Sequence, residues 1–359
     1  MRNKYDVVII GGGIFGTAMF YYLLKYTSKK ALLLEKRRIC SGATGSSGGF
    51  IRLLHSSLNL CDLSTKSFDE FNQFEKKIGM PCGLVKTGFF TIDSYKNLPA
   101  IEDHLQLIKN RGFQIECLTS REAARRFNCL EMPIDDDKVV IYEKDSGYAD
   151  PIRTCKAYLS AGVSLGGDVL ENVEVQSIVT KNGKVIGVKS SYSSFETPCA
   201  ILAAGVGTYD FLKILGYKEP KFIKKIIQIG FYKYPLNNLP FPTFLDKTLG
   251  LYGRDYGDNR CLLGLTEESE QINDDQEPHL SMKVARKLTN VASKFAPWIT
   301  AKCWIEGRCG IDAYTKNCEG IVEFLPEVKG LLVCSGGSGI GFKLAPEYAK
   351  YAISKIENY

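Results

Sequence analysis

A glycine-rich turn directly after an apolar strand is the feature that most constrains the fold of this chain. Residues 5–10, Y-D-V-V-I-I, predict a parallel strand buried on both faces. The strand leads into the spacing G-x-G-x-x-G at Gly11, Gly13 and Gly16. The first glycine permits the tight turn, the second lets the backbone approach a pyrophosphate, and the third allows a helix to pack closely. The motif therefore predicts a dinucleotide site at a helix N-terminus.

The residues after this motif strengthen the prediction. A helix is expected to about Thr27, followed by a second strand at 31–34 that ends at Glu35, 19 residues after Gly16. An acid at this distance binds a ribose hydroxyl in dinucleotide-binding folds. The unit predicts a dinucleotide cofactor but does not by itself separate NAD from FAD.

A second glycine cluster lies near the other end of the chain. Residues 330–334 predict a buried strand, residues 336–341 contain four glycines, and a helix is expected over 345–357. A helix N-terminus at this point would favour negative charge on a ligand. A long cofactor that reaches both glycine clusters explains them together, and FAD has that length.

Length and charge exclude several classes of protein. A chain of 359 residues predicts two domains. The net charge of +6 comes from scattered residues, with no dense basic stripe for nucleic acid. No apolar run approaches the 20 or so residues of a membrane span, and no secretory signal precedes the first strand. We expect a soluble, cytoplasmic protein with no nucleic-acid partner and no transmembrane segment.

The 12 cysteines predict neither a disulfide framework nor a metal site. They stand singly, many in apolar runs such as C-A-I-L at 199–202, and no C-x-x-C pair occurs. Buried thiols in a reducing compartment are the expected state.

Between the two glycine clusters the pattern mixes helices and short strands. Helices are expected at 58–78, 97–111, 152–160 and 281–296, a strand-turn-strand at 84–93, and strands at 168–179, 184–189 and 200–204. Asn182-Gly183 between two of these strands predicts a hairpin.

The ordered set of motifs resembles the FAD-dependent oxidoreductases of the D-amino-acid-oxidase type, particularly glycine oxidase and the sarcosine oxidases. The resemblance spans nearly the whole chain and rests on five segments: VVIIGGGIFGTAMFYYL with LLLEK, SGATGSSGGFIRLLH, DSGYADP, AILAAGVGTYDFLKILG and GLLVCSGGSGIGFKLAP. It implies an α/β fold: a Rossmann-like, glutathione-reductase-like FAD-binding domain with an inserted α+β substrate domain built on an antiparallel sheet. On this basis residues 1–83, 145–215 and 305–359 form the discontinuous FAD-binding domain, and residues 84–144 and 216–304 form the substrate domain.

The resemblance also implies which residues contact FAD, and that the cofactor is held noncovalently. These residues come from the first glycine turn, the loop after the second strand, two later strand positions and the second glycine cluster. They are Gly11, Gly13, Ile14, Phe15, Gly16, Glu35, Lys36, Ala43, Thr44, Gly45, Ser46, Val175, Gly205, Gly339, Ile340, Gly341, Phe342 and Lys343.

The substrate side is implied by fewer residues. Lys343 stands where a lysine of sarcosine oxidases holds the substrate carboxylate. Arg52 is the available arginine of the F-I-R-L-L-H segment, whereas an ungapped match places His55 at the carboxylate-binding position. Tyr252 matches a substrate-facing tyrosine of glycine oxidase.

One position departs from the family pattern. The carboxylate-binding arginine of a G-L-R-P segment is replaced by Asp312 in G-I-D-A. Sarcosine oxidases use that position for a cysteine bonded to flavin, which leaves Cys309, three residues away, as a secondary candidate for linkage. An acid beside the flavin would favour a cationic amine.

The resemblance implies oxidation of a C–N bond in a small amine or amino acid, of the glycine, sarcosine, D-amino or imino acid type. Hydride passes to flavin N5, the imine hydrolyses, and O₂ is reduced to H₂O₂. A dehydrogenase of the same fold, using a quinone or protein acceptor or acting on a 2-hydroxy acid, remains open. A non-catalytic flavin-binding subunit or sensor and a nicotinamide enzyme also remain open. The sequence does not give the oligomeric state.

Overall fold

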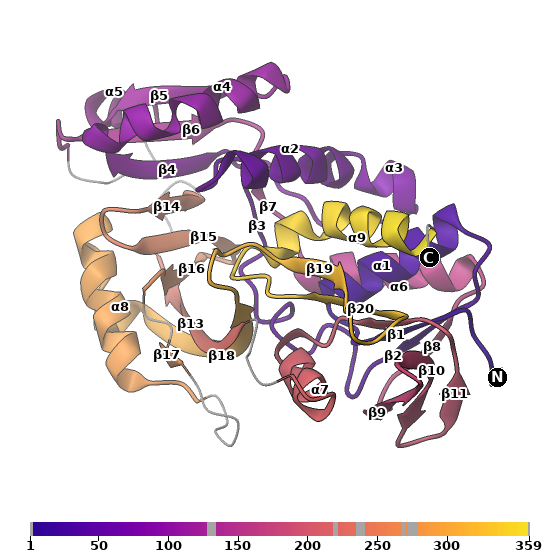
Figure 1. The fold of residues 1–359 in the computed structure, drawn as a ribbon. Coiled ribbons are helices and arrows are strands. Elements are labelled where there is room, and N and C mark those ends of the chain that lie inside the picture. Colours follow the sequence, from indigo (N-terminus) through magenta and orange to yellow (C-terminus); the bar gives the residue numbers. More distant parts are fainter. Residues whose placement is uncertain are drawn as a thin grey trace.

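Two large sheets dominate the computed structural model, which describes residues 3–127, 134–217, 222–234, 241–267, 270–271 and 279–357. A mostly parallel sheet lies beside the chain termini, and an antiparallel sheet lies at the other end of the molecule (Figure 1). The structure confirms the mixed α/β fold with a second sheet.

The mostly parallel sheet is assembled from segments far apart in the sequence. Its strand order is β19-β20-β12-β1-β2-β8, and only the edge strand β19 is antiparallel. The apolar runs predict this burial, because a parallel strand is covered on both faces. The strands are β1 (Val7–Ile10), β2 (Ala31–Leu34), β8 (Asp168–Leu170), β12 (Ala200–Leu202), β19 (Ile321–Phe324) and β20 (Leu331–Ser335).

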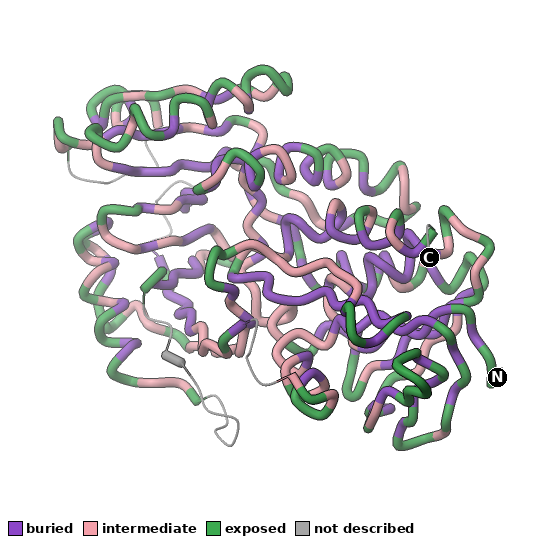
Figure 2. The backbone as a smooth tube through the Cα atoms, viewed as in Figure 1, coloured by how far each residue is buried: buried purple, intermediate pink, exposed green. Residues whose placement is uncertain are grey.

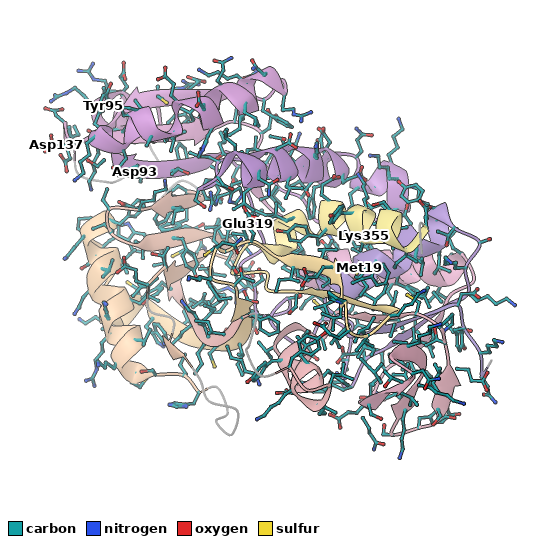
Figure 3. The ribbon with its side chains drawn as sticks, in the orientation of Figure 1. Met19, Asp93, Tyr95, Asp137, Glu319 and Lys355 are labelled. Atoms are coloured by element: carbon teal, nitrogen blue, oxygen red, sulfur yellow. The ribbon has the colours of Figure 1, made fainter. Side chains whose placement is uncertain are left out.

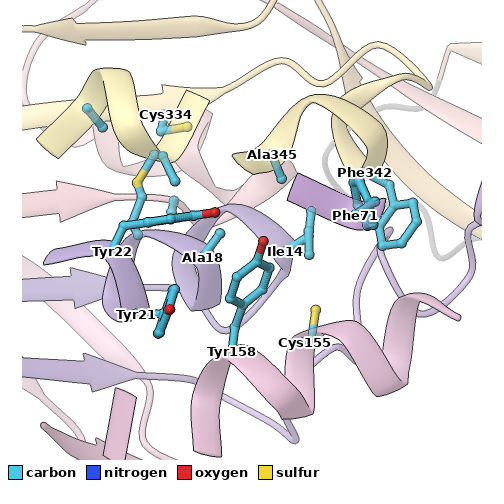
Figure 4. Packing of buried hydrophobic residues seen from close by; sticks show 14 of the residues in the cluster. Ile14, Ala18, Tyr21, Tyr22, Phe71, Cys155, Tyr158, Cys334, Phe342 and Ala345 are labelled. Carbon is cyan, nitrogen blue, oxygen red and sulfur yellow. The ribbon is translucent and has the colours of Figure 1, made fainter. Parts of the chain in front are cut away.

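Helices cover one face of this sheet. α1 (Ile14–Tyr26) packs between α6 (Pro151–Ser164) and α9 (Gly341–Glu357). The aromatic rings of Tyr22 and Tyr158 meet in this layer, with centroids 5.9 Å apart (Figure 4). Alternate strand residues, among them Val7 and Ile9, point into this core.

The other face carries a small sheet and a short helix. Val8 and Ile10, which alternate with the residues named above, belong to this second core. The covering elements are β9 (Val175–Lys181), β10 (Lys184–Ser190), β11 (Ser194–Glu196), the 3₁₀ turn η2 (Gly205–Gly207) and α7 (Thr208–Ile214). The predicted hairpin is confirmed: Asn182 and Gly183 join β9 to β10 with φ of 51° and 70°.

The antiparallel sheet has the strand order β17-β13-β16-β15-β14-β4-β6-β5, and β18 also pairs with β13. α8 (Met282–Phe295) packs on one face of it, and the opposite face lies toward the parallel sheet (Figures 1 and 2). The strands are β4 (Phe89–Ser94), β5 (Ile115–Thr119), β6 (Lys138–Glu143), β13 (Ile223–Lys233), β14 (Phe244–Asp246), β15 (Leu251–Gly257), β16 (Arg260–Leu265), β17 (Glu270–Gln271) and β18 (Trp304–Tyr314).

Two connecting regions join the sheets. β3 (Phe50–Ile51) pairs with β7 (Gly147–Tyr148), and α2 (Leu58–Asn72) with α3 (Phe74–Ile78) runs above α9. Asp93, which is labelled in Figure 3, lies on β4. It accepts a hydrogen bond from Lys247 at 2.9 Å, which ties β4 to the turn after β14. The remaining elements are η1 (Tyr95–Ile101), α4 (Glu102–Asn110), α5 (Ser120–Arg126) and η3 (Ala301–Cys303).

Several predicted elements are interrupted. The helix expected at 58–78 breaks at Gln73, whose φ and ψ of −105° and 13° are not helical. The strand expected at 168–179 is two strands in different sheets, β8 and β9. The first half of the strand-turn-strand at 84–93 is wrong, because Val85 makes only an isolated bridge to Tyr148.

Sheet membership refines the proposed domain division. The parallel sheet takes β1 and β2, then β8 and β12, then β19 and β20, as a discontinuous FAD-binding domain requires. β18 pairs with β13 along its length and so belongs to the antiparallel sheet. We therefore place the last boundary of the proposed division near residue 315 rather than at 305.

Candidate active site

The first glycine turn has the geometry that only glycine allows. Gly11 has a φ of 108°, and a Cβ there would stand 2.4 Å from the carbonyl of Ala203. A Cβ on Gly16 would overlap the carbonyl oxygen of Gly11. Helix α1 therefore starts in direct contact with the end of β1, and its first-turn N–H groups lack intrahelical partners. A turn of this geometry at a helix N-terminus is suited to hold a phosphate group.

Glu35 lies at the end of β2, beside this turn. One carboxylate oxygen accepts a hydrogen bond from Gly12 N–H at 2.7 Å, and the other accepts one from Arg37 N–H at 2.8 Å. The acid is thus fixed next to the glycine turn, as the ribose-binding prediction requires. Lys36, which follows it, is exposed.

The loop after β2 folds back over the start of α1. Thr44 Oγ1 accepts a hydrogen bond from Ile14 N–H at 3.2 Å, which places the loop at the helix N-terminus. The other predicted contacts in this loop, Ala43, Gly45 and Ser46, are half-buried within the same series of turns. The loop and the glycine turn therefore form one site.

The second glycine cluster meets the first. The ring of Phe15, in the first turn of α1, contacts the start of α9: a Cβ on Gly341 would lie 3.0 Å from it. Three positions before α9 have positive φ: Gly336 at 77°, Ser338 at 49° and Gly339 at 75°. Two helix N-termini thus converge, and the residues fit a long cofactor with a diphosphate. Ile340 is half-buried in the same loop.

Further predicted FAD contacts are Val175, Gly205 and Phe342. Val175 is the first residue of β9 and is buried in the core of the far face. Gly205 begins η2, and its carbonyl accepts a hydrogen bond from Ser335 Oγ at 2.9 Å. The side chain of Phe342 packs on Phe71 of α2, with ring centroids 5.4 Å apart (Figure 4).

A buried cationic cluster lies where the glycine clusters meet. Lys343, on the first turn of α9, is only 5% exposed, and the described residues give it no ion-pair partner. Arg52 and His55, from the segment after β3, interact electrostatically with it. The Nε2 of His55 is buried without a hydrogen-bond partner among the described residues. Three of the predicted substrate residues are therefore together.

Burial controls the protonation of this cluster. It lowers the pKa of Lys343 well below the usual value, and the charge of Arg52 lowers it further. Burial and the same arginine lower the pKa of His55, so its imidazole is neutral near pH 7. The carboxylates of Glu143 and Asp312 oppose the shift in the pKa of Lys343, and a substrate carboxylate beside this amine would oppose it further.

Glu143, at the end of β6, is a residue that sequence reasoning missed. Its carboxylate is fully buried and accepts hydrogen bonds from Leu53 N–H at 2.6 Å, Leu54 N–H at 3.1 Å and Ser146 Oγ at 2.6 Å. Burial raises its pKa, while Arg52 opposes that shift. Glu143 holds the segment that carries Arg52 and His55. In the sequence, Glu143 is marked by its place directly after the apolar run V-V-I-Y at 139–142.

Asp312, on β18, also interacts electrostatically with Lys343. Its Oδ2 accepts a hydrogen bond from Gly339 N–H at 2.7 Å, and its Oδ1 accepts one from Ala313 N–H at 2.9 Å. Burial raises its pKa, and these hydrogen bonds and the charge of Lys343 oppose the shift. Tyr314, also missed from the sequence, interacts with both Asp312 and Tyr252.

Tyr252 lies on the sheet face turned toward this cluster. Its ring lies across Gly264, whose missing side chain provides the space, and packs edge-on against Phe50 with centroids 5.5 Å apart. Burial raises the pKa of its hydroxyl. The structure thus links all five predicted substrate residues into one set.

Cys309 does not belong to this set. On β18, Gly310 faces Ser46 of the loop after β2, because a Cβ on Gly310 would lie 2.7 Å from the Cβ of Ser46. Successive residues of a strand point to opposite faces, so the neighbouring Cys309 projects to the other face of the sheet. Its pairing partner on β13, Gln228, bonds to the residue preceding α8. The secondary candidate for a flavin linkage is therefore turned away.

Comparison with known proteins decides the family. Residues 6–354 match the FAD dependent oxidoreductase family. The chain belongs to this family. FAD is the cofactor of the family, and the glycine turn, Glu35 and the loop around Thr44 fit it.

Seven cysteines are buried, as expected, and two of the others are exposed; Cys129 lies outside the described residues.

Individual relatives of this FAD-dependent oxidoreductase act on small amines and amino acids. Human peroxisomal sarcosine oxidase is 24% identical over 97% of this chain and 91% of its own length. Mouse mitochondrial sarcosine dehydrogenase is 28% identical over 60% of this chain, and the match spans only 24% of its length. A glycine oxidase structure from Geobacillus kaustophilus has a TM-score of 0.84 and 22% identity, covering 99% of this chain and 95% of that one.

Two absences hold for the part of the chain that the structure describes. None of its helices is long and apolar enough to cross a membrane. Nor do its His, Cys, Asp and Glu side chains form a group of three or more suited to a metal ion.

Proposed function

We propose that the protein oxidises the C–N bond of a small amine or amino acid that carries a carboxylate, transfers hydride to flavin N5, and passes electrons to O₂ to form H₂O₂. The imine product hydrolyses in water. The observation that carries the proposal is the buried set of Lys343, Arg52 and His55 facing Asp312, at the point where both glycine clusters meet. The activities of relatives such as sarcosine oxidase and glycine oxidase agree with it.

Bound FAD supplies the two-electron acceptor for this chemistry. The residues of the protein orient the substrate and stabilise the charges of its carboxylate and amine. Lys343 and Arg52 bind the substrate carboxylate, because a carboxylate forms strong charge-assisted hydrogen bonds with an ammonium and a guanidinium group. Tyr252 and Tyr314 close the side that faces the sheet and exclude water.

The substrate amine must lose a proton before its C–H bond can give up hydride. Because the pKa of His55 is lowered, its imidazole is a weaker base than the substrate amine, so the amine loses its proton to water and can then donate a hydrogen bond to the unpaired Nε2 of His55. Asp312 places a negative charge near the same region and attracts the amine. The cations beside the site also stabilise the negative charge that develops as O₂ accepts electrons.

Anaerobic bleaching of the bound flavin tests this proposal. A panel of D-amino, N-methyl and cyclic imino acids is mixed with the enzyme, and the reduced enzyme is then exposed to air. Bleaching followed by rapid peroxide formation is expected. Slow reoxidation without peroxide would replace O₂ with another acceptor and favour a dehydrogenase. A protein that stays yellow with every compound would contradict the proposal and favour a non-catalytic flavin-binding role.

The cytoplasmic location and the noncovalent state of FAD remain predictions. Trichloroacetic acid precipitation tests the latter: a yellow supernatant with a colourless pellet is expected.

A further inference from the structure

The loop after β2, residues 41–49, is held at its beginning by the FAD-binding segments. Cys40 N–H donates a hydrogen bond to Gly12 O at 2.9 Å, just before the loop starts. Thr44 Oγ1 accepts one from Ile14 N–H at 3.2 Å. Both contacts precede the middle of the loop, so the position of its second half depends on other contacts.

The second half of this loop lies against the antiparallel sheet. A Cβ on Gly310 of β18 would lie 2.7 Å from the Cβ of Ser46. From β15, Arg254 Nε donates a hydrogen bond to Gly48 O at 2.6 Å. The sheet therefore contacts the loop at two places, and at Gly48 it does so through a directed hydrogen bond.

The side chain of Arg254 is buried and held in one orientation. The residue is 6% exposed, and its Nη1 donates a second hydrogen bond to Asp255 O at 2.7 Å. Its guanidinium carbon lies 4.1 Å from the ring centroid of Tyr148 and 5.0 Å from that of Tyr256. Cation–π contacts of this kind fix the guanidinium group. The Nε–H is therefore aimed at the single carbonyl of Gly48.

Tyr148 connects Arg254 to the end of the loop by a second route. Tyr148 lies on β7 and pairs with Phe50, the first residue of β3, directly after the loop. The next residue of the chain, Ala149, donates its N–H to Gly49 O at 2.9 Å. Gly49 has a φ of 70°, and a Cβ there would overlap the carbonyl oxygen of Ala149. Arg254 thus fixes both the loop end and the strand that receives it.

The stability of the sheet alone does not account for an arginine at this position. Arg254 forms no ion pair within the described residues, and the Asp255 carboxylate already accepts hydrogen bonds from Tyr234 Oη at 2.7 Å and Gly257 N–H at 3.1 Å. Burial lowers the pKa of Arg254, and the charge of Arg308 lowers it further. A buried cation costs free energy that an apolar side chain of similar volume would avoid.

We infer that Arg254 is a positioning residue for the cofactor: it holds the second half of the loop after β2 against the antiparallel sheet, which keeps the first half over the start of α1 and slows the release of FAD. An arginine suits this role, because its planar group can stack on a ring while an N–H points at a carbonyl. The inference goes beyond the proposed function, since it concerns retention of the cofactor and no step of amine oxidation.

The rate of FAD release tests the inference. Arg254→Met keeps an apolar side chain in place but removes the charge and the donor. Loss of a charge-assisted hydrogen bond predicts release about 10-fold faster than in wild type. Flavin fluorescence after dilution of the holoenzyme measures the rate, and the ratio of absorbance at 450 nm to that at 280 nm measures FAD content. Arg254→Lys keeps a cation and a donor, so its rate should be intermediate.

Arg308→Met is the matched control. Arg308 is two residues from Gly310 on β18 and so shares its face of the sheet. Its guanidinium lies 5.3 Å from the ring centroid of Phe231, and within the described residues it makes no hydrogen bond to the loop. FAD release from this variant should match the wild type. Equal acceleration in Arg254→Met and Arg308→Met would assign the effect to lost positive charge and overturn the inference.

Other outcomes are equally decisive. A wild-type release rate and full FAD content in Arg254→Met would overturn the inference. Urea unfolding of the apoprotein should give similar free energies for Arg254→Met and Arg308→Met. If Arg254→Met does not fold, Tyr148→Leu decides, because it removes the ring beneath the guanidinium and leaves the arginine in place. Release as slow as in wild type would then contradict the inference. The assay contains no substrate, so its outcome is independent of the proposed reaction.

Discussion

Asp312 Oδ2 accepts a hydrogen bond from the backbone N–H of Gly339 at 2.7 Å. This bond joins β18 of the antiparallel sheet to the glycine loop before α9, four residues ahead of Lys343. The acid that departs from the family pattern therefore links the two sheets at the candidate site. It also interacts electrostatically with Lys343 and supports the protonated form of that amine.

Carboxylate binding should depend on pH through Lys343. The group binds an anion only when protonated, and burial lowers its pKa well below the usual lysine value. The dissociation constant of an unreactive carboxylate should therefore be constant at low pH and rise as pH increases through this lowered pKa. Calorimetric titration between pH 6 and 10 measures the midpoint. A constant affinity up to pH 10 would show that Lys343 keeps an ordinary pKa or does not bind the anion.

Lys343→Met should raise KM and slow flavin reduction. Loss of a charge-assisted hydrogen bond predicts a decrease of about 10–100-fold in kcat/KM. Stopped-flow bleaching of the flavin under anaerobic conditions measures the reductive step. Lys355→Met, further along the same helix (Figure 3), is the matched control and should behave as the wild type. Unchanged reductive kinetics in Lys343→Met would remove the lysine from the site.

Asp312→Asn should shift the pH dependence of carboxylate binding to lower pH. The substitution keeps the size of the side chain but removes a negative charge that raises the pKa of Lys343. The amine then loses its proton at lower pH, so binding weakens earlier as pH increases. Asp136→Asn changes a carboxylate that is 82% exposed and should leave the midpoint in place. An equal shift in both variants would point to net charge rather than to contact with Lys343.

Local patterns predicted the parts of the site that lie within one segment. The turn from β1 into α1 requires glycine at Gly11 and Gly16 for steric reasons, so the sequence shows it directly. Glu143 is different, because its function depends on Leu53 and Leu54, some 90 residues away. No single-sequence pattern reports such a contact.

The arrangement of the antiparallel sheet was hidden for the same reason. Arg254 and Arg308 belong to strands whose register is set by β13 and β16, which lie between them in the sheet. The aromatic-rich, strand-like pattern of residues 222–264 indicates strands but not how they pair. The pairing of β18 with β13, about 80 residues earlier, likewise leaves no mark in the sequence of either strand.

Gly16→Ala should abolish FAD binding. The added Cβ would overlap the carbonyl oxygen of Gly11, so α1 would have to move away from β1 and from the phosphate site. The ratio of absorbance at 450 nm to that at 280 nm measures the FAD content of the purified protein. Gly42→Ala is the control, because a Cβ there meets nothing within 4 Å. Full FAD content in Gly16→Ala would contradict the placement of the cofactor at this turn.

Glu70→Gln should lower the free energy of unfolding in a pH-dependent way. Glu70 on α2 bonds to Lys77 and to Lys350 of α9, each at 2.7 Å, and to Tyr22 of α1 at 3.0 Å. Burial alone would raise its pKa, but the two lysines outweigh burial and the pKa is lowered. Because the folded-state pKa lies below the unfolded value of about 4.3, the stabilisation is present above that value and disappears as pH falls through the folded-state pKa.

At pH 7 with FAD in excess, the loss in Glu70→Gln should be about 1–3 kcal/mol, measured by urea unfolding. The difference from wild type should shrink below about pH 4, where the wild-type carboxylate also becomes neutral. Glu116→Gln breaks an ion pair with Arg126 in which both side chains are at least 40% exposed, and should cost less than about 1 kcal/mol. A deficit in Glu70→Gln that stays constant down to pH 3 would mean that side-chain packing, rather than charge, stabilises the junction of these helices.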